Sequence, residues 1–207
     1  MSCNVLIVED QKMPRQLREI FIAGSGRYTL AGSITNANLA IRFCEQEKID
    51  LILMDVLTDF GISGLDASAE IKKRFPEVKI IIVTSMPEAT WLDRARAIGV
   101  DSFWYKETEK ESILEVMDRT IAGEHVWPED TPIVPIGHVT NHDFTDREIE
   151  VLRELLTGDT NTEIARRLGV TADTVKFHIA SMLQKTGFHT RTYSAALSSS
   201  STIFPIS

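Results

Sequence analysis

The first 122 residues alternate short apolar runs with amphipathic stretches. Runs of four to six residues, rich in branched aliphatic and aromatic side chains, predict strands over 5–8, 28–33, 51–54, 80–83 and 102–105. Apolar residues that recur every three or four positions predict helices over 15–23, 39–47, 65–75, 89–98 and 111–122. This alternation predicts an α/β fold: a doubly wound, five-stranded parallel sheet with helices on both faces.

The pattern changes after residue 122. Residues 123–143 contain several prolines and show no helical period, which predicts a linker. Residues 144–197 are helical in pattern, and residues 198–207, which begin with a run of serines, predict an irregular tail.

Within 144–197 the helix signals predict three helices. Thr145 and Glu148 have the spacing of a capping box, and Thr171 is placed to cap the third helix. Expected helix stops are Gly158, Gly169 and Gly187. Two helices joined by a tight glycine-containing turn predict a small all-α helix-turn-helix domain, whose second helix enters the major groove of DNA.

Polar residues stand directly after the predicted strands, where doubly wound sheets bind their ligands. Glu9 and Asp10 follow the first strand, Asp55 the third, Thr84 the fourth and Lys106 the fifth. Three crowded carboxylates repel one another unless a hard cation lies among them, and Mg²⁺ prefers oxygen ligands. We therefore predict a phosphoryl-binding site with Asp55 as nucleophile, Lys106 as a point charge and Thr84 as a hydroxyl donor.

The segments that carry these groups resemble the receiver domain of bacterial two-component response regulators. They read Val5-Leu-Ile-Val-Glu-Asp10, Leu51-Ile-Leu-Met-Asp55, Ile81-Ile-Val-Thr84-Ser85 and Phe103-Trp-Tyr-Lys106. The resemblance implies that a sensor histidine kinase phosphorylates Asp55 and that Lys106 pairs with the phosphate. It also implies that Mg²⁺ is held by Glu9, Asp10, Asp55 and the Leu57 carbonyl. On phosphorylation Thr84 would shift and Phe103 would turn inward behind it.

The chain departs from that family's pattern at two places. The loop after Asp55 lacks the usual Met-Pro pair and is one residue longer, and Glu107 replaces a common cis-proline, so we expect a trans bond there. Leu57 and Met86, which flank the site in this family, cannot orient a hydrolytic water. We hypothesise a long-lived phosphoryl group.

Net charge at first argues against a nucleic-acid partner, because 22 basic residues face 30 acidic ones and leave −8. However, residues 164–191 contain five basic residues and a single acidic one, a local +4 that is typical of a surface that binds DNA phosphates.

The second domain resembles the LuxR-type output domain in Phe144-Thr-Asp-Arg-Glu148, Asn161-Thr-Glu-Ile-Ala165 and Thr171-Ala-Asp-Thr-Val-Lys-Phe-His178. The whole chain then resembles a response regulator of the NarL/FixJ family. This implies that Lys176 and Phe177 face base edges of double-stranded DNA. It also implies that the DNA phosphates are contacted, or those contacts buttressed, by Thr171, Thr174, His178 and Lys185. The fourth helix that helps to form the DNA-bound dimer in this family is barely a turn here, over 193–197, so a homodimer is only one possibility.

These patterns favour a phosphorylation-activated transcription regulator rather than an enzyme. With no apolar run of ~18 residues, no signal peptide and two distant cysteines, we expect a cytoplasmic protein without a membrane span. One alternative is a receiver that acts by protein contact without phosphorylation. A second is an aspartyl-phosphate phosphohydrolase, which needs a second Asp where Leu57 stands. A third is a flavodoxin-like FMN protein, whose Ser/Thr-rich phosphate loop is missing here.

Overall fold

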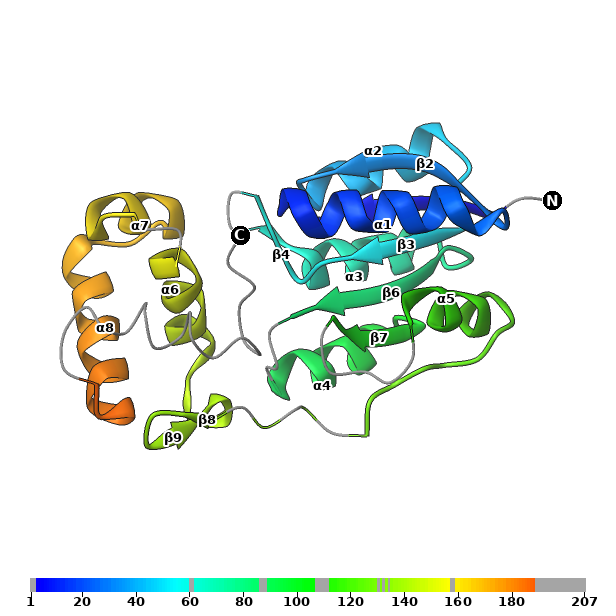
Figure 1. The fold of residues 1–207 in the computed structure, drawn as a ribbon. Helices are drawn as coiled ribbons and strands as arrows, with labels where there is room; N and C mark the ends of the chain where they lie inside the picture. Colours follow the sequence, from blue (N-terminus) through cyan, green and yellow to red (C-terminus); the bar gives the residue numbers. More distant parts are fainter. Residues whose placement is uncertain are drawn as a thin grey trace. The chain divides into compact units, whose positions relative to one another are not determined.

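Two sets of secondary structure follow one another along the chain (Figure 1). The structure, a computed structural model, describes residues 3–59, 62–85, 89–106, 112–129, 131, 133, 135–156 and 159–188. Contacts divide the chain into an N-terminal unit, residues 1–84 and 91–130, and a C-terminal unit made mainly of residues 131–207. Among the described residues, no helix has the length and apolar character needed to cross a bilayer.

The N-terminal unit contains a five-stranded parallel sheet of order β2-β1-β3-β6-β7. Its strands are β1 (Cys3–Val8), β2 (Tyr28–Ile34), β3 (Leu51–Met54), β6 (Lys79–Thr84) and β7 (Ser102–Tyr105). Every residue of β3 is buried, as expected of a central strand that is covered on both faces. The predicted fold class is thereby confirmed for this unit.

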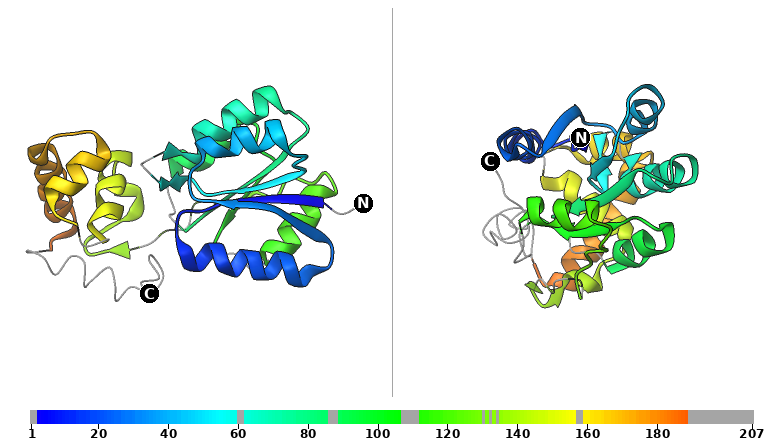
Figure 2. Two further views of the ribbon diagram at one scale, coloured as in Figure 1. Left: turned by 90° about the horizontal axis from the view of Figure 1, so that it is seen from above. Right: turned by 90° about the vertical axis from the view of Figure 1, so that its right-hand side faces the viewer.

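Helices cover both faces of that sheet, as Figure 2 shows. Helices α1 (Lys12–Ser25) and α5 (Ile113–Ile121) lie on one face, and α2 (Asn38–Gln46), α3 (Gly64–Arg74) and α4 (Ala89–Ile98) lie on the other. The core under α1 and α5 is made of aliphatic side chains from alternate strand positions, among them Val5, Ile7, Leu51, Leu53, Ile81 and Val83. This packing fixes the direction of the strands, and therefore the edge at which their carboxyl ends meet.

In the described part of the C-terminal unit there are three α-helices, α6 (Asp146–Leu156), α7 (Asn161–Leu168) and α8 (Ala172–Thr186). The predicted capping box is present, because Thr145 N–H donates to Glu148 Oε2 at 2.8 Å and Glu148 N–H donates to Thr145 Oγ1 at 3.3 Å. Thr171 caps α8 as predicted. Gly169 and Gly187 end α7 and α8 in the left-handed conformation, which also confirms those two stops.

The expectation of a plain linker over residues 123–143 needs correction at both ends. At its start, Phe103 N–H donates to the Val126 carbonyl at 2.9 Å, so the chain runs along the free edge of β7. Near its end lie a hairpin, β8 (Pro135–Ile136) with β9 (Val139–Thr140), and a 3-10 turn, η2 (Asn141–Asp143). His138 N–H donates to the Thr186 carbonyl at 3.1 Å, which ties the hairpin to the end of α8. The prolines indicate only which local backbone conformations this segment prefers. They do not indicate the hydrogen bonds that it makes with β7 and α8.

Some expectations concern residues outside the described ranges. These are the helix stop at Gly158, the trans bond at Glu107, the flanking role of Met86, the short helix over 193–197 and the tail over 198–207. They stay predictions from the sequence.

Candidate functional site

The carboxylates predicted from the strand ends come together at one edge of the sheet. Val8 of β1 pairs with Met54 of β3, which brings the residues after each strand side by side. One carboxylate oxygen from each of Glu9, Asp10 and Asp55 lies within 4.8 Å of the others. Glu9 is fully buried and Asp55 is 6% exposed. Asp10 is half-buried, and such a set of close oxygen donors suits a small divalent cation.

Lys106 from the end of β7 reaches the same point. Its Nζ lies 2.7 Å from Glu9 Oε2 and 2.9 Å from Asp55 Oδ2. Burial lowers the pKa of the Lys106 ammonium, and the charge of Asp55 acts in the opposite direction. The sheet therefore delivers a buried cation directly to the nucleophile that the sequence predicts.

Arg18 is a member of this cluster that the sequence reasoning missed. It lies on α1, is 6% exposed, and its Nη2 donates to Glu9 Oε2, the oxygen that also accepts from Lys106. Burial lowers the pKa of Arg18 to about 10, so the guanidinium is still charged near neutral pH. The sequence does indicate that Arg18 is buried, because position 18 falls on the buried face of the amphipathic helix, four residues before Ile22.

Gly64, the first residue of α3, is a second feature that was missed. A Cβ atom at this position would lie 1.9 Å from the carbonyl oxygen of Asp55. The segment between Asp55 and Gly64 forms a small hairpin, β4 (Leu57–Thr58) with β5 (Ile62–Ser63), although Phe60 and Gly61 lie outside the described residues. Leu57 N–H lies 3.4 Å from Asp55 Oδ1, so the loop also contacts the nucleophile's side chain.

The two residues expected to form a switch are both buried. Thr84 is 2% exposed and Phe103 is 1% exposed. The Phe103 ring is 5.0 Å from the ring of Tyr105 and stacks on Trp127 at 6.2 Å. Phe103 is therefore already turned inward, and Trp127 from the segment after α5 contributes to its burial.

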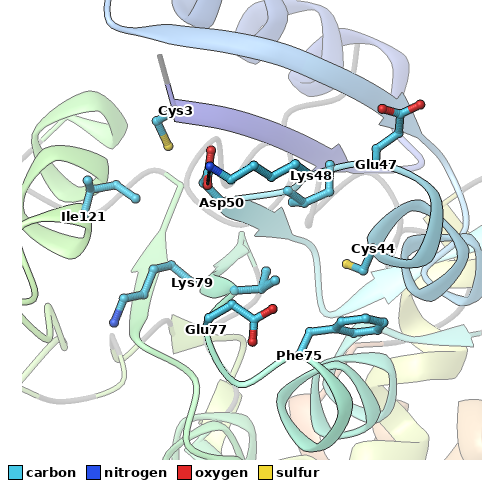
Figure 3. Close-up of a pocket in the computed structure, with 11 residues that line it drawn as sticks. Cys3, Cys44, Glu47, Lys48, Asp50, Phe75, Glu77, Lys79 and Ile121 are labelled. Atoms are coloured by element: carbon cyan, nitrogen blue, oxygen red, sulfur yellow. Dashed lines mark ion pairs between the residues drawn. The ribbon is translucent and has the colours of Figure 1, made fainter. Parts of the chain in front are cut away.

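A cavity of about 460 Å³ lies at the opposite, amino end of the strands (Figure 3). Cys3 and Cys44 both line it as free thiols. Burial raises the pKa of each thiol to about 11, and nearby acidic groups, Asp50 for Cys3 and Glu77 for Cys44, add to the effect. The thiols stay protonated near neutral pH and are poor nucleophiles and metal ligands there. Because this cavity lies at the amino end of the strands, it is separate from the carboxylate cluster at their carboxyl end.

In the C-terminal unit, α8 exposes the residues expected at the DNA bases. Phe177 is 70% exposed, and its ring meets the His178 ring edge-on at 5.6 Å. Lys176 is exposed, and its Nζ lies 3.0 Å from Asp173 Oδ1 one turn earlier. The exposed half of α8 therefore presents an aromatic and a basic side chain next to each other.

Two of the four residues expected at DNA phosphates shape the start of α8. Thr171 Oγ1 accepts from Thr174 N–H at 3.1 Å, and the two hydroxyl oxygens lie 2.8 Å apart. Thr174 is half-buried, as is His178. These threonines hold the first turn of the helix in place.

Lys185, the last of the four, is engaged within the C-terminal unit. Its Nζ lies 2.7 Å from Glu148 Oε2 and donates to the Asp143 carbonyl at 2.8 Å. Glu148 is 3% exposed and also accepts from Ser181 and Thr145. Although burial alone raises the pKa of Glu148, these hydrogen bonds lower it to about 2.

The positive charge of residues 164–191 is partly neutralised by the acidic residues that precede it. Arg167 Nη1 lies 3.1 Å from Glu154 Oε2, and its Nη2 contacts Asp159. Lys185 pairs with Glu148, whereas Arg166 and Lys176 are exposed. The sequence count of +4 therefore overstates the charge that this segment presents to DNA, because counting cannot show which charges are paired.

The sequence matches two known protein families, one in each unit. The sequence pattern of the "Response regulator receiver domain" matches residues 5–118, and that of "Bacterial regulatory proteins, luxR family" matches residues 142–198. The chain belongs to the response regulators that combine a receiver with a LuxR-type helix-turn-helix. Members of this family are DNA-binding regulators and not turnover enzymes.

Relatives extend this match to nearly the whole chain. Response regulator protein VraR of Staphylococcus aureus is 31% identical over 197 residues, which cover 93% of this chain and 94% of VraR. The VraR of Staphylococcus epidermidis is 32% identical over the same length. A structure of two RcsB dimers bound to two parallel DNAs covers 96% of this chain with a TM-score of 0.57 at 19% identity, which shows the shared fold.

Replacing Gly64 by Ala tests the close approach of α3 to Asp55. Because the added methyl group meets a backbone oxygen at 1.9 Å, we expect a loss of about 1–3 kcal/mol in the free energy of unfolding. All three tryptophans lie in the N-terminal unit, so urea unfolding followed by their fluorescence measures this unit alone. Gly24→Ala is the matched control, since nothing lies within 4 Å of its Cβ position. Equal stability of the two variants would contradict the clash.

The low pKa of Glu148 predicts a pH-dependent stability of the C-terminal unit. The folded pKa of about 2 lies below the ordinary value of 4.5, so the stabilisation is complete above pH 4.5 and is lost as the pH falls towards 2. We expect this stabilisation to be worth about 3 kcal/mol. An NMR titration of the Glu148 carboxyl carbon measures the pKa directly, and a midpoint near 4.5 would contradict the prediction. Glu148→Gln should remove this part of the pH dependence of thermal unfolding.

Proposed function

We propose that the protein is a phosphorylation-activated transcription regulator of a two-component system. The receiver spans residues 1–122, a connecting segment residues 123–143, the DNA-binding domain residues 144–197 and an irregular tail residues 198–207. The observation that carries the proposal is Lys106 Nζ, 2.9 Å from Asp55 within a cluster of three carboxylates. A cation that already touches the nucleophile is placed to neutralise a phosphoryl group transferred to it.

Asp55 accepts the phosphoryl group from a phosphohistidine of a sensor kinase. An Asp55 carboxylate oxygen attacks phosphorus, the O–P bond forms as the P–N bond breaks, and the histidine nitrogen leaves with the bonding electron pair and takes up a proton. Lys106 stays with the phosphoryl oxygens throughout, and Thr84 supplies its hydroxyl. The protein catalyses only this transfer to itself and the later hydrolysis, which we expect to be slow beside Leu57.

Mg²⁺ fits the donor set at this site. Glu9, Asp10 and Asp55 supply oxygen atoms within 4.8 Å of one another, and the Leu57 carbonyl is the proposed backbone ligand. When bound, Mg²⁺ neutralises charge that develops on the phosphoryl oxygens. The carboxylates hold it, and Lys106 remains at Asp55.

Helix α8 is the proposed DNA-reading element. Lys176 and Phe177 are exposed on its first half and face base edges, while Thr171, Thr174 and His178 contact phosphates or support those contacts. Lys185 supports the phosphate-contacting residues and does not contact a phosphate itself, because it is paired with buried Glu148. Since its ligand is DNA, we place the protein in the cytoplasm.

Helix α1 presents a surface for the sensor kinase or for a second copy in a homodimer. Four apolar side chains on one face of the helix are at least 40% exposed, namely Met13, Leu17, Ile20 and Phe21. The solved RcsB assembly contains dimers on DNA, and an exposed apolar stripe of this kind indicates a partner.

Asp55→Asn tests the phosphorylation. We expect complete loss of labelling by acetyl phosphate and Mg²⁺, because the amide is not a nucleophile, together with loss of the increase in DNA affinity that phosphorylation produces in the wild type. Labelling and DNA binding are measured on the same preparations. Labelling at another residue would contradict the assignment, and an unchanged DNA response would favour a receiver that acts by protein contact alone.

Lys176→Ala tests base reading by α8. We expect operator affinity to fall by about 1–3 kcal/mol, with relaxed preference at one base pair, if Lys176 contacts a base edge. Lys73→Ala removes the same charge from an exposed position on α3 and serves as the control. Binding to an operator and to a panel of single-base variants is measured at fixed salt. An unchanged operator affinity in Lys176→Ala would remove this residue from the interface.

A further inference from the structure

Arg18 makes the carboxylate cluster of this chain different from a simple metal site. Its Nη2 and Lys106 Nζ share one oxygen, Glu9 Oε2, and Gln11 N–H occupies the other oxygen at 3.1 Å. Both oxygens of Glu9 are therefore already used by the protein. A metal ion that binds Glu9 must compete with Arg18 for this carboxylate.

The charge balance shows which ligands the cluster favours. Two side-chain cations, Arg18 and Lys106, contact the carboxylates, and a third, Arg15, donates to the Glu9 carbonyl at 2.9 Å, so three positive charges balance the three carboxylates. A divalent cation alone therefore adds two uncompensated positive charges to the site. Since an acyl phosphate carries about two negative charges in place of the single charge of Asp55, the phosphoryl group offsets part of the charge that the metal adds.

The side chain of Arg18 also retains an unused donor. Its Nε–H is buried and donates no hydrogen bond to any described residue. A buried guanidinium held only for packing would ordinarily have its donors satisfied. Here a donor is left for an acceptor that enters the site, and a phosphoryl oxygen is the strongest such acceptor.

We propose that Arg18 is a positioning residue that opposes Mg²⁺ binding in the unphosphorylated protein and favours the phosphoryl group once it is attached to Asp55. The inference rests on the proposed phosphorylation of Asp55. Arg18 acts through Glu9: while the guanidinium holds Oε2 the metal binds weakly, and a phosphoryl group draws the guanidinium away from the carboxylate. Metal and phosphoryl group thereby bind cooperatively.

The test measures two affinities of the full chain that should move in opposite directions. MgCl₂ is titrated into unphosphorylated protein, and backbone amide shifts beside Asp10 give the dissociation constant. We expect Arg18→Met to bind Mg²⁺ about tenfold more tightly than the wild type, since a buried positive charge beside the metal is removed. At saturating Mg²⁺ we expect the same variant to bind beryllofluoride, a phosphoryl mimic, about tenfold more weakly.

Matched variants separate this role from a structural one. Arg18→Lys keeps the charge and should stay within about threefold of the wild type in both titrations, since charge dominates the interaction. Lys12→Met removes a charge from an exposed position of α1 and should change neither affinity by more than about twofold, because water and salt screen it. Arg18→Gln removes the charge but keeps a donor towards Glu9, and it repeats the test if Arg18→Met does not fold in EDTA.

The outcomes distinguish this inference from the proposed function. If the wild type binds neither Mg²⁺ nor beryllofluoride, both the phosphorylation site and the inference fail. If the wild type binds both ligands and the neutral variants bind them equally well, the site stands and the role of Arg18 is wrong. Affinities that rise together or fall together would likewise overturn the opposed effects.

Discussion

The buried carboxylate of Glu9 is the constraint on which the N-terminal unit depends. An ionised group without solvent is costly unless it is paired and hydrogen-bonded, and the cost in proteins is several kcal/mol. Glu9 meets this condition through Arg18 from α1, Lys106 from β7 and the backbone at Gln11. The docking of α1 and the position of the edge strand are thus tied to the end of β1. The pairing of β1 with β3 then places Asp55 beside Lys106, one of these two cations.

The C-terminal unit, which has a different fold, is likewise organised around a buried carboxylate. Buried Glu148 accepts hydrogen bonds from Thr145 at the start of α6 and from Ser181 and Lys185 on the second half of α8. The hairpin of β8 and β9 adds a backbone bond to Thr186. Helix α8 is therefore anchored at its C-terminal half. On its first half, Lys176 and Phe177 face solvent while Val175 is buried, which is the arrangement that a groove-reading helix requires.

Much of the site could be predicted from the sequence, because strand ends are local features. Apolar runs locate the strands, a parallel topology aligns their carboxyl ends, and Glu9, Asp10, Asp55 and Lys106 follow directly. Arg18 was missed because it lies on a helix and not at a strand end, although an arginine on the apolar face of an amphipathic helix is a recognisable sequence feature. Gly64 could not be found this way, since its requirement comes from the carbonyl of Asp55, which only the folded chain brings to within reach.

Tertiary pairing explains the remaining errors. The proline-rich segment after residue 122 was predicted to be a linker, and the sequence did not indicate that Val126 bonds to β7 or that Trp127 stacks on Phe103. Likewise the basic residues of 164–191 gave a charge count but not their partners, and Arg167 and Lys185 are paired with acids of the preceding segment. Composition indicates the conformation and the charge that a segment has in isolation. The contacts described here are made with residues outside that segment, so composition cannot predict them.

The stacking of Trp127 on Phe103 also limits how a signal can leave the receiver. Interiors are close-packed, so a buried ring cannot change place unless its neighbours move with it. Phe103 is 1% exposed between Tyr105 and Trp127, and Tyr105 belongs to the same strand of the sheet. Trp127 instead lies on the segment that leads out of the receiver, and its only backbone ties nearby are the bonds of Val126 to Ser102 and Phe103 among the described residues. Because the Trp127 ring also carries the Arg96 guanidinium of α4 at 5.3 Å, a rearrangement at Phe103 requires the contact between Trp127 and α4 to adjust as well.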